Sequence, residues 1–497
     1  MAAKLKIALV NPRMEGPYPP LGLGYIASYL REYGAYDYDI RIIDGNACDG
    51  VEEETERFGP DIVGFTGHSP QIKEAVELSR AVRRWRPEVF QVIGGVHVSA
   101  DPAGTLTRGA FDAAVLGEGE RTFTELVDTI AGGAPDRTRG LRGTAFIEGG
   151  EVVINPAREQ ITDLDAIPYP ARDLFAMDYY MGPSFGVRGK VSRGVTSITS
   201  SRGCPYNCLF CGVNIVFKKV RQFSRPYCIG EITELVERYG ARALYFADDT
   251  FTVNKAKVAE FCDMLIASKL ASKVKWTAQA RANLIDWDDL EMLRLMKAAG
   301  CIQLEYGFES GSDRVLGILK QNRVTVADNQ RAIDVTHASG LRTLGTFIVG
   351  TPGETEEDVE MTREFVRRNL TRLDYFQTFI CTPFPGSDLY RTCVERGLVE
   401  PDYFDEIARR EKDPQPPVFT DTIDREVVVE TLRHLDYLGL RKVSLRDKAL
   451  WVLYHLTGKG DVSHHDRFYI FKRLFFYARR LIGPAAPRAG GSAAPGA

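Results

Sequence analysis

Two separate series of alternating strand and helix patterns run along this 497-residue chain. The first occupies residues 4–130, and the second begins near Gly194. In both, short apolar runs typical of strands alternate with amphipathic stretches of helical period, as they do in parallel sheets whose strands are joined by helices. The length also exceeds that of one ordinary domain. The alternation therefore predicts an α/β protein that contains two parallel-sheet units.

The first series predicts a doubly wound, Rossmann-like sheet with strands at KIALVNP, DIRIID, DIVGFTG, FQVIGGVH and DAAVLGEGE. Ligands on such sheets bind beyond the carboxyl ends of the strands. Glycines at these ends would let the backbone approach a large flat ligand, and they are Gly94, Gly95, Gly117 and Gly119. Ordinary nucleotide binding is the alternative, although no G-x-G-x-x-G follows the first strand.

The second series predicts a partial (β/α)6 barrel of the TIM type, whose chemistry would lie at the carboxyl ends of its strands. The expected strands are TSITSSRG, ALYFADD, KWTAQARAN, CIQLEYGFES, RTLGTFIVG and YFQTFICTPF. We expect the Rossmann-like domain over 1–142, a hairpin and linker over 143–193, the barrel over 194–395, a mainly helical C-terminal region over 396–483 and a disordered tail over 484–497.

Three of the nine cysteines lie close together in the segment SRGCPYNCLFCGVN, at the end of the first barrel strand. Cys204, Cys208 and Cys211 have the spacing Cys-x3-Cys-x2-Cys. Three thiolates in one loop can hold three irons of a [4Fe–4S] cube and leave the fourth iron open. A zinc site and buried structural cysteines are the alternatives, but structural zinc usually takes four protein ligands and no second cysteine pair is present. The spacing favours the cluster.

This cysteine loop resembles that of the radical S-adenosylmethionine (SAM) superfamily. The resemblance implies that the open iron binds the amino and carboxylate groups of SAM. Reductive cleavage would give methionine and a 5'-deoxyadenosyl radical, which abstracts a hydrogen atom. The motifs at successive strand ends imply the SAM contacts Phe210, Asp249, Arg281, Glu309, Ser310, Ile348 and Gly350.

Each of these SAM contacts also has a structural interpretation. A guanidinium suits a carboxylate, so Arg281 would meet the carboxylate of SAM, but it would equally pair with Glu309 and hold the barrel together. Asp249 would serve as a helix cap. Thr346 departs from the glycine often found in the fifth-strand motif. The order of these motifs along the chain favours the SAM site.

The segments PPLGLGYIASYL, VGFTGHSP, IGGVHVSADP and VLGEGE resemble the cobalamin-binding domain that precedes the barrel in one large branch of this superfamily. The resemblance covers roughly residues 4–395 and implies cobalamin as a further cofactor, held beside the four glycines named above. The motif Asp-x-His-x-x-Gly, whose histidine ligates cobalt from below, is absent. For His68 and His97 we favour polar strand-end roles over cobalt ligation.

The resemblance implies a small-molecule substrate, an electron donor such as flavodoxin or ferredoxin, and two main chemistries. Methylation of an unactivated carbon through methylcobalamin is the commoner one in the branch and ranks first. A ring-forming, ring-rearranging or oxidative reaction, as in the anaerobic magnesium-protoporphyrin ester cyclase, is the alternative. A non-catalytic corrinoid- or cluster-binding protein is the third hypothesis, against which the SAM-contact positions argue.

Composition and charge limit the kinds of binding partner that this chain is expected to have. The formal net charge of -4 provides no basic excess for nucleic acid. No window holds about 18 uninterrupted apolar residues, and the start lacks the features of a signal peptide, so we expect a cytoplasmic protein. The stretch RFYIFKRLFFYARRLI combines an apolar stripe with basic residues. Such a helix can lie on an anionic membrane, which would suit a lipophilic substrate, but packing on its own domain is favoured.

Overall fold

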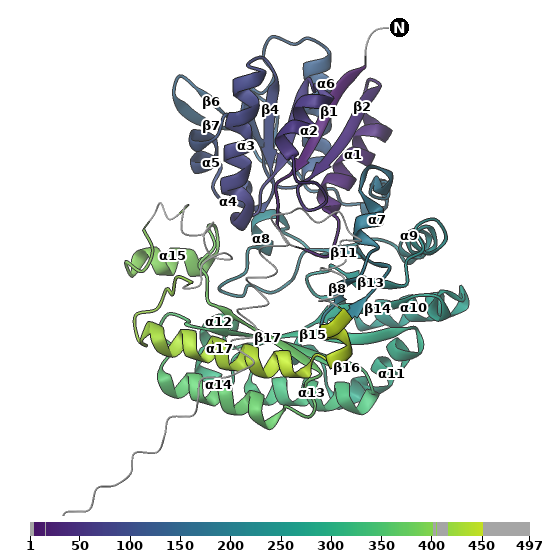
Figure 1. Cartoon of the computed structure of the whole chain (residues 1–497), viewed down its shortest axis with the longest axis vertical. Helices are drawn as coiled ribbons and strands as arrows, with labels where there is room; N and C mark the ends of the chain where they lie inside the picture. Colours follow the sequence, from purple (N-terminus) through teal and green to yellow (C-terminus); the bar gives the residue numbers. More distant parts are fainter. Residues whose placement is uncertain (1–3, 15, 401–403, 405–415, 451–497) are drawn as a thin grey trace, which may run out of the picture.

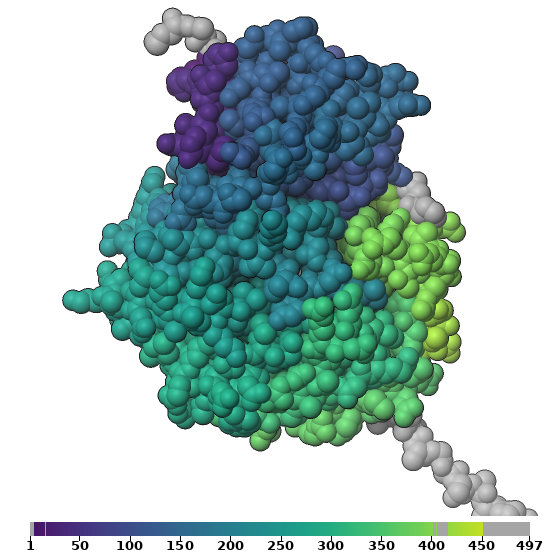
Figure 2. Space-filling view, turned by 180° about the vertical axis from the view of Figure 1, so that it is seen from behind, coloured from purple at the N-terminus to yellow at the C-terminus, as the bar shows by residue number. Residues whose placement is uncertain are grey.

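The computed structural model describes residues 4–14, 16–400, 404 and 416–450. Figure 1 shows the first sheet with its helices stacked on the second, so that the carboxyl ends of the N-terminal strands face the barrel. The space-filling view in Figure 2 shows the two units in direct contact, with a light-green part of the second unit reaching the N-terminal unit at one side. This arrangement brings the strand ends of both sheets to one boundary.

The N-terminal sheet has seven strands in the order β2-β1-β3-β4-β5-β6-β7. The first five in this order are parallel, and β6 and β7 are antiparallel to their neighbours. The order 2-1-3-4-5 belongs to doubly wound folds, which confirms the predicted fold class. The bounds are β1 (Leu5–Asn11), β2 (Tyr38–Asp44), β3 (Ile62–Thr66), β4 (Phe90–Gly94), β5 (Ala113–Val115), β6 (Thr144–Glu148) and β7 (Glu151–Ile154).

Helices cover both faces of this sheet because successive side chains of a strand point to opposite sides. Leu9 of β1 packs with Leu30 and Phe123 on one face. Val10, the next residue, packs with Val76 on the other. The helices are α1 (Leu21–Tyr33), α2 (Val51–Phe58), α3 (Ile72–Trp85), α4 (Val96–Ala100), α5 (Pro102–Arg108) and α6 (Gly119–Ala131).

The hairpin β6–β7 was expected in the segment that connects the two units, but in the structure it belongs to the first sheet. It pairs with β5 through Ala114 and Ala145 and so extends the first sheet. The physical reason is that the edge of β5 would otherwise present unpaired backbone groups. The linker that follows is ordered through a buried ion pair of 2.7 Å between Arg172 and Glu231. It contains α7 (Met177–Tyr180) and the small hairpin β8 (Ser184–Val187) and β9 (Lys190–Ser192).

The second sheet is the predicted partial barrel, with six parallel strands in sequence order. They are β10 (Val195–Ile198), β13 (Ala243–Phe246), β14 (Lys275–Ala280), β15 (Cys301–Glu309), β16 (Arg342–Val349) and β17 (Tyr375–Ile380). The helices are α9 (Arg225–Glu237), α10 (Lys255–Ala267), α11 (Leu290–Ala298), α12 (Asp313–Lys320), α13 (Val326–Ser339), α14 (Glu356–Arg368), α15 (Asp388–Glu395) and α17 (Arg425–Lys442).

Helix α17 covers the last strand, β17. Its Leu435 is buried in the barrel core, and a Cβ on its Gly439 would lie 2.6 Å from the carbonyl oxygen of Phe376. Helix α15, which follows β17 directly, packs instead on a separate apolar cluster with α12. Helix α17 therefore packs on the barrel although it lies beyond residue 395, in the region expected to be mainly helical.

Among the helices of the described residues, none is both long enough and apolar enough to cross a bilayer. Residues 467–482, for which packing on the protein's own domain was favoured over a place on a membrane surface, and the tail at 484–497 lie outside the described residues.

Candidate functional site

The three clustered cysteines lie in a loop between two short paired strands, β11 (Ser201–Arg202) and β12 (Arg221–Gln222). The loop also contains α8 (Val213–Val216). All three thiols are free and half-buried. Gly203 enters the loop with φ 90°, and a Cβ there would lie 2.6 Å from the carbonyl oxygen of Lys219. Only glycine fits this tight start of the loop.

The cysteine loop is seated on α12 and α15. The Leu209 N–H donates to Leu319 at 2.9 Å, and the Leu209 carbonyl accepts from Leu389 at 2.8 Å. Phe210 and Ile348 pack on the same apolar cluster as these helices. The structure thus brings together two of the expected SAM contacts, although they are 138 positions apart in the sequence (348 − 210).

Arg281 lies against the cysteine loop. Its Nη1 is 3.2 Å from Cys208 Sγ, and its guanidinium carbon is 3.9 Å from the centroid of the Tyr206 ring. Its Nη2 is buried without a hydrogen-bond partner among the described residues. A donor left open in this way can bind an anionic ligand, and a cation beside the thiols suits an anionic iron–sulfur cluster.

Glu309 does not pair with Arg281, which was the structural alternative. Glu309 forms an ion pair with Lys320, in which Oε1 and Nζ are 2.8 Å apart, and both side chains are buried. Glu309 has φ 62°, an unusual conformation for a residue with a side chain. Lys320 also lies 5.6 Å above the Phe210 ring. Sequence reasoning missed Lys320, because no motif includes it.

The remaining expected SAM contacts, which are Ser310, Asp249 and Gly350, mainly contact other parts of the protein. Ser310 is fully buried, and its hydroxyl lies 3.0 Å from that of Thr362. Asp249 accepts the Gly203 N–H at 3.0 Å, so it ties the second barrel strand to the cysteine loop. Burial raises the pKa of Asp249 to about 6, against the effect of that backbone bond. Gly350 has φ 80° and lies beneath Val428 of α17. Direct SAM contacts from these residues stay predictions.

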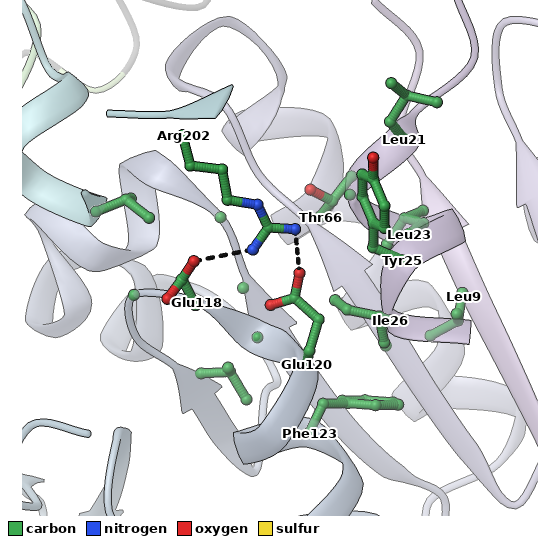
Figure 3. A pocket seen from close by; sticks show the side chains of 18 of the residues that line it. Leu9, Leu21, Leu23, Tyr25, Ile26, Thr66, Glu118, Glu120, Phe123 and Arg202 are labelled. Carbon is green, nitrogen blue, oxygen red and sulfur yellow. Dashed lines mark hydrogen bonds and ion pairs between the residues drawn. The ribbon is translucent and has the colours of Figure 1, made fainter. Parts of the chain in front are cut away.

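A cavity of about 290 Å³ lies where the two units meet. Figure 3 shows side chains from both units around it. The barrel contributes Thr199, Ser201, Arg202, Ala247 and Asp249, next to the cysteine loop. The N-terminal domain contributes all four predicted glycines together with apolar side chains such as Leu9, Ile26 and Phe123.

The structural reason for a glycine differs among these four positions of the cavity wall. At Gly117, with φ 75°, a Cβ would meet nothing within 4 Å, so the backbone faces open space. At Gly94 a Cβ would make ordinary contact with Val115. At Gly95 it would lie 2.6 Å from the carbonyl oxygen of Gly67, which makes glycine necessary for packing inside the domain. At Gly119 it would lie 3.0 Å from Ile26. The close approach of a flat ligand is best supported at Gly117.

Neither nearby histidine lines this cavity. His68 Nδ1 lies 2.9 Å from the Gln71 side chain, and His97 Nδ1 lies 3.0 Å from the Ser69 hydroxyl. Burial lowers the pKa of both, that of His97 to about 4. Their placement agrees with polar roles at strand ends.

Four charged side chains join the cavity wall to the cysteine loop. Arg202 contacts Glu118 at 2.9 Å and Glu120 at 2.6 Å, and Arg221 contacts Glu118 at 2.8 Å. Burial opposes the charge on Glu118, but the hydrogen bonds from both arginines outweigh it and lower its pKa. Sequence reasoning noticed only the glycines of VLGEGE. The alternation of glycine with glutamate, and the arginine before the first cysteine, were the available indications.

The three thiols of the loop and the lining of the cavity are the kinds of group that the predicted cofactors need. No three His, Cys, Asp or Glu side chains within the described residues are gathered around a site for one metal ion. Three free thiols in one loop, beside an arginine, match a cube in which each thiolate binds a different iron. The glycines and the apolar wall of the cavity have the surface chemistry that suits contact with the flat face of a corrin ring.

Comparison with known proteins agrees with both units. A family model of the radical SAM superfamily matches residues 198–366, and one of the B12 binding domain matches residues 8–127. An uncharacterised methyltransferase of Pyrococcus horikoshii is 35% identical over 411 residues, which cover 80% of this chain and 84% of the relative. The chain belongs to the radical SAM superfamily, in the branch with an N-terminal B12-binding domain.

Other members of this branch are similar over most of the described chain. The anaerobic magnesium-protoporphyrin IX monomethyl ester cyclase of Cereibacter sphaeroides is 29% identical over 369 residues, 72% of this chain and 59% of the relative. The radical SAM methyltransferase TsrM of Kitasatospora setae, solved with cobalamin and a [4Fe–4S] cluster, has a TM-score of 0.63 at 18% identity, covering 79% of this chain and 78% of that one. At this low sequence identity, the similarity to TsrM shows a shared fold.

Membership in this branch identifies the cofactors as a [4Fe–4S] cluster, SAM and cobalamin. The cysteine loop would hold the cluster, the strand ends around Arg281 would hold SAM, and the cavity at Gly117 would hold the corrinoid. The cavity and the cysteine loop are neighbours, because Asp249 lines the cavity and accepts a hydrogen bond from Gly203 at the start of the loop. Arg281 contacts Cys208 of the same loop.

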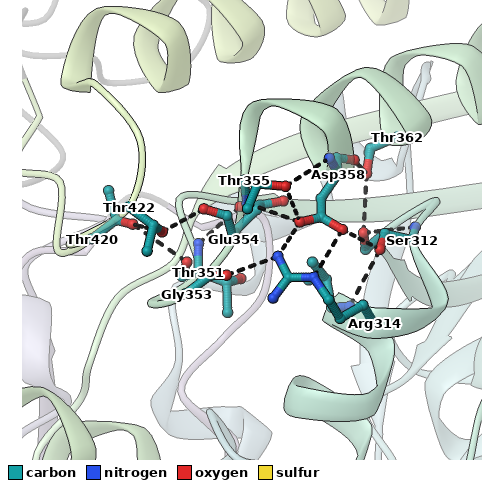
Figure 4. Close-up of polar contacts among 12 residues, drawn as sticks. Ser312, Arg314, Thr351, Gly353, Glu354, Thr355, Asp358, Thr362, Thr420 and Thr422 are labelled. Atoms are coloured by element: carbon teal, nitrogen blue, oxygen red, sulfur yellow. Dashed lines mark hydrogen bonds and ion pairs between the residues drawn. The ribbon is translucent and has the colours of Figure 1, made fainter.

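Figure 4 shows Glu354 among the polar contacts of the loop that follows β16. Its Oε2 accepts the N–H groups of Gly350 and Thr351 at 2.7 and 3.0 Å, while Oε1 is buried without a partner among the described residues. Burial raises its pKa from 4.5 to about 7, against those two bonds. The folded protein therefore binds this proton more tightly than the unfolded chain.

We expect the contribution of protonated Glu354 to stability to be complete below about pH 4.5 and to be lost as the pH rises through about 7. The loss amounts to about 3 kcal/mol. Between pH 5 and 8, urea unfolding should show the wild type losing more stability than Glu354→Gln. Glu357→Gln, at an exposed position of α14, should follow the wild type. Parallel curves for all three proteins would contradict this assignment.

Proposed function

We propose that this protein methylates an unactivated carbon of a small molecule, with SAM as the source of the radical and cobalamin as the methyl carrier. One observation carries the proposal. The cavity of the B12-binding domain opens onto the barrel strand ends that bear the cysteine loop, and Arg202 and Asp249 of the barrel are part of its wall. A methyl carrier and a radical source held at one boundary suit transfer between them.

The residues of this chain would bind and orient these groups. Cys204, Cys208 and Cys211 would hold the cluster, and Arg281 would pair with the carboxylate of SAM through its open Nη2. Phe210 and Ile348 would border the adenine. When bound, the cluster supplies the electron that splits SAM, and the corrinoid supplies a transferable methyl group. The cytoplasmic location, the flavodoxin- or ferredoxin-type donor and a lipophilic substrate stay predictions.

The products of SAM test this function before any substrate is known. Protein purified without oxygen and loaded with iron and sulfide would be incubated with SAM, a strong reductant and hydroxocobalamin. We expect S-adenosylhomocysteine to form only when hydroxocobalamin is present, and 5'-deoxyadenosine to form only when the cluster is present.

The cyclase-like chemistry is the second candidate, supported by the similarity to the Cereibacter sphaeroides enzyme. It consumes SAM only as a radical source. Formation of 5'-deoxyadenosine without any S-adenosylhomocysteine, under the same conditions, would therefore replace methyl transfer by this alternative. The absence of both products would favour a non-catalytic binding protein.

A further inference from the structure

The cysteine loop has a narrow neck made by the two-stranded ribbon β11–β12. Arg202 and Arg221 are paired across this ribbon, so one arginine stands at each end of the loop that holds Cys204, Cys208 and Cys211. Both arginines bind the same carboxylate. Arg202 Nη1 and Arg221 Nη2 each lie 2.9 Å from Glu118 Oε1, and Arg221 Nη1 lies 2.8 Å from Oε2. A residue of the N-terminal domain thus closes the neck of a loop that belongs to the barrel.

The second carboxylate of this group is Glu120, which lies 2.6 Å from Arg202 Nη2. Glu118 and Glu120 stand at the beginning of α6 and alternate with Gly117 and Gly119. These four residues and Arg202 all line the same cavity. Figure 3 shows Arg202 reaching across to both carboxylates at the cavity wall. The neck of the loop and the wall of the cavity are therefore built from the same side chains.

The group is balanced in charge and excluded from water. Two arginines face two glutamates, and the side chains of all four are at most 9% exposed. The guanidinium of Arg202 also lies 5.1 Å above the ring of Tyr25, another residue of the cavity wall. A buried set of charges has few alternative arrangements, because any displaced member leaves an uncompensated charge. Such a set transmits a displacement at one end to the other.

We propose that Arg202, Arg221, Glu118 and Glu120 form a neck clamp, which couples occupancy of the corrinoid cavity to retention of the iron–sulfur cluster. A corrinoid that orders the Gly117–Glu120 segment fixes the carboxylates that close the loop. A loaded cluster fixes the loop, and with it the arginines that hold the cavity wall. Because coupling between two sites is reciprocal, each cofactor raises the affinity for the other. The four residues act as positioning residues.

The proposal rests on the binding of both cofactors and not on the outcome of the reaction. Absence of S-adenosylhomocysteine in the product experiment would leave it standing. A clamp that served only to staple the two domains together would lower stability when removed, but it would not link the two affinities.

The test compares the dissociation constant of hydroxocobalamin for cluster-loaded and cluster-free protein, measured by absorbance after ultrafiltration under anaerobic conditions. We expect the cluster to tighten hydroxocobalamin binding by about fivefold or more in the wild type. In parallel, hydroxocobalamin should slow the release of iron to a chelator. If the wild type bound hydroxocobalamin equally tightly with and without the cluster, so that the ratio of the two dissociation constants were one, the proposal would be overturned.

The decisive variant is the double substitution Arg202→Met with Glu120→Gln. It removes one charge of each sign, so it keeps the group neutral and leaves the Arg221–Glu118 pair intact. We expect its ratio of dissociation constants to fall to about one while both forms still bind hydroxocobalamin. Retention of the wild-type ratio would overturn the proposal.

Glu120→Gln alone provides a second variant that changes fewer contacts, and its ratio should fall between those of the wild type and the double variant. Glu125→Gln is the matched control. Glu125 lies on the same helix and pairs with Arg158 of the linker, but it touches neither the ribbon nor the cavity. Its ratio should equal that of the wild type.

Discussion

Cys208→Ala should abolish cluster assembly and lower the rate of 5'-deoxyadenosine formation by at least about 10³-fold. Cys208 stands in the middle of the cysteine loop, and its Sγ contacts the guanidinium of Arg281. Without this thiolate, one iron of the cube loses its protein ligand. Iron and sulfide analysis, absorbance near the cluster bands and product quantification in the presence of SAM and reductant measure the effect.

Cys48→Ala is the matched control for this substitution. Cys48 is also free and half-buried, but it packs beside the core of the N-terminal domain. Its replacement should leave iron content and product formation unchanged. A Cys208→Ala protein with normal iron content and normal SAM cleavage would refute the assignment of the loop as the cluster site.

The second large effect is expected at Arg281. Its Nη2 is a buried donor without a partner among the described residues, and its Nη1 touches a cluster thiol. Arg281→Gln should weaken SAM binding to the cluster-loaded protein by about 10- to 100-fold, because a hydrogen-bonded ion pair with a carboxylate is lost. Arg281→Lys should be intermediate, since lysine keeps the charge but not the planar pair of donors. Equilibrium dialysis with labelled SAM measures the affinity.

Iron content must be measured beside SAM affinity, because Arg281 also contacts the cysteine loop. Arg294→Gln serves as the control, since Arg294 is an exposed residue of α11 that pairs only with Glu291 among the described residues. Full cluster content combined with unchanged SAM affinity in Arg281→Gln would remove Arg281 from the SAM site.

Much of the fold could be predicted because it depends on neighbouring residues. The strands that end at Asn11, Gly94 and Val349 show local apolar runs followed by turn residues. The cysteine spacing is equally local, and it directed attention to the carboxyl end of β10, after which the three cysteines lie. The partner of the hairpin β6–β7 could not be predicted, because an edge strand is completed by whichever hairpin the tertiary fold brings beside it.

Within the site, sequence reasoning named residues that lie inside motifs and missed residues that reach the motifs from elsewhere in the chain. Arg281 contacts Cys208, and Phe210 lies within the cysteine loop, while their contacts with SAM stay predictions. Lys320, which pairs with Glu309, lies at the end of a helix with no motif of its own. The pairing of Glu309 with Arg281, the structural alternative to a SAM contact, is not formed, because Glu309 pairs with Lys320 instead.

By itself, the sequence determined the two α/β units, the close grouping of three cysteines and the glycines that line the cavity, since each follows from the spacing of residues close together in the chain. Only the tertiary structure decided that Arg202 meets Glu118 and that Arg221 meets the same carboxylate. These contacts join residues 84 and 103 positions apart. They arise because two domains dock with their strand ends facing each other, and local periodicity carries no information about that docking.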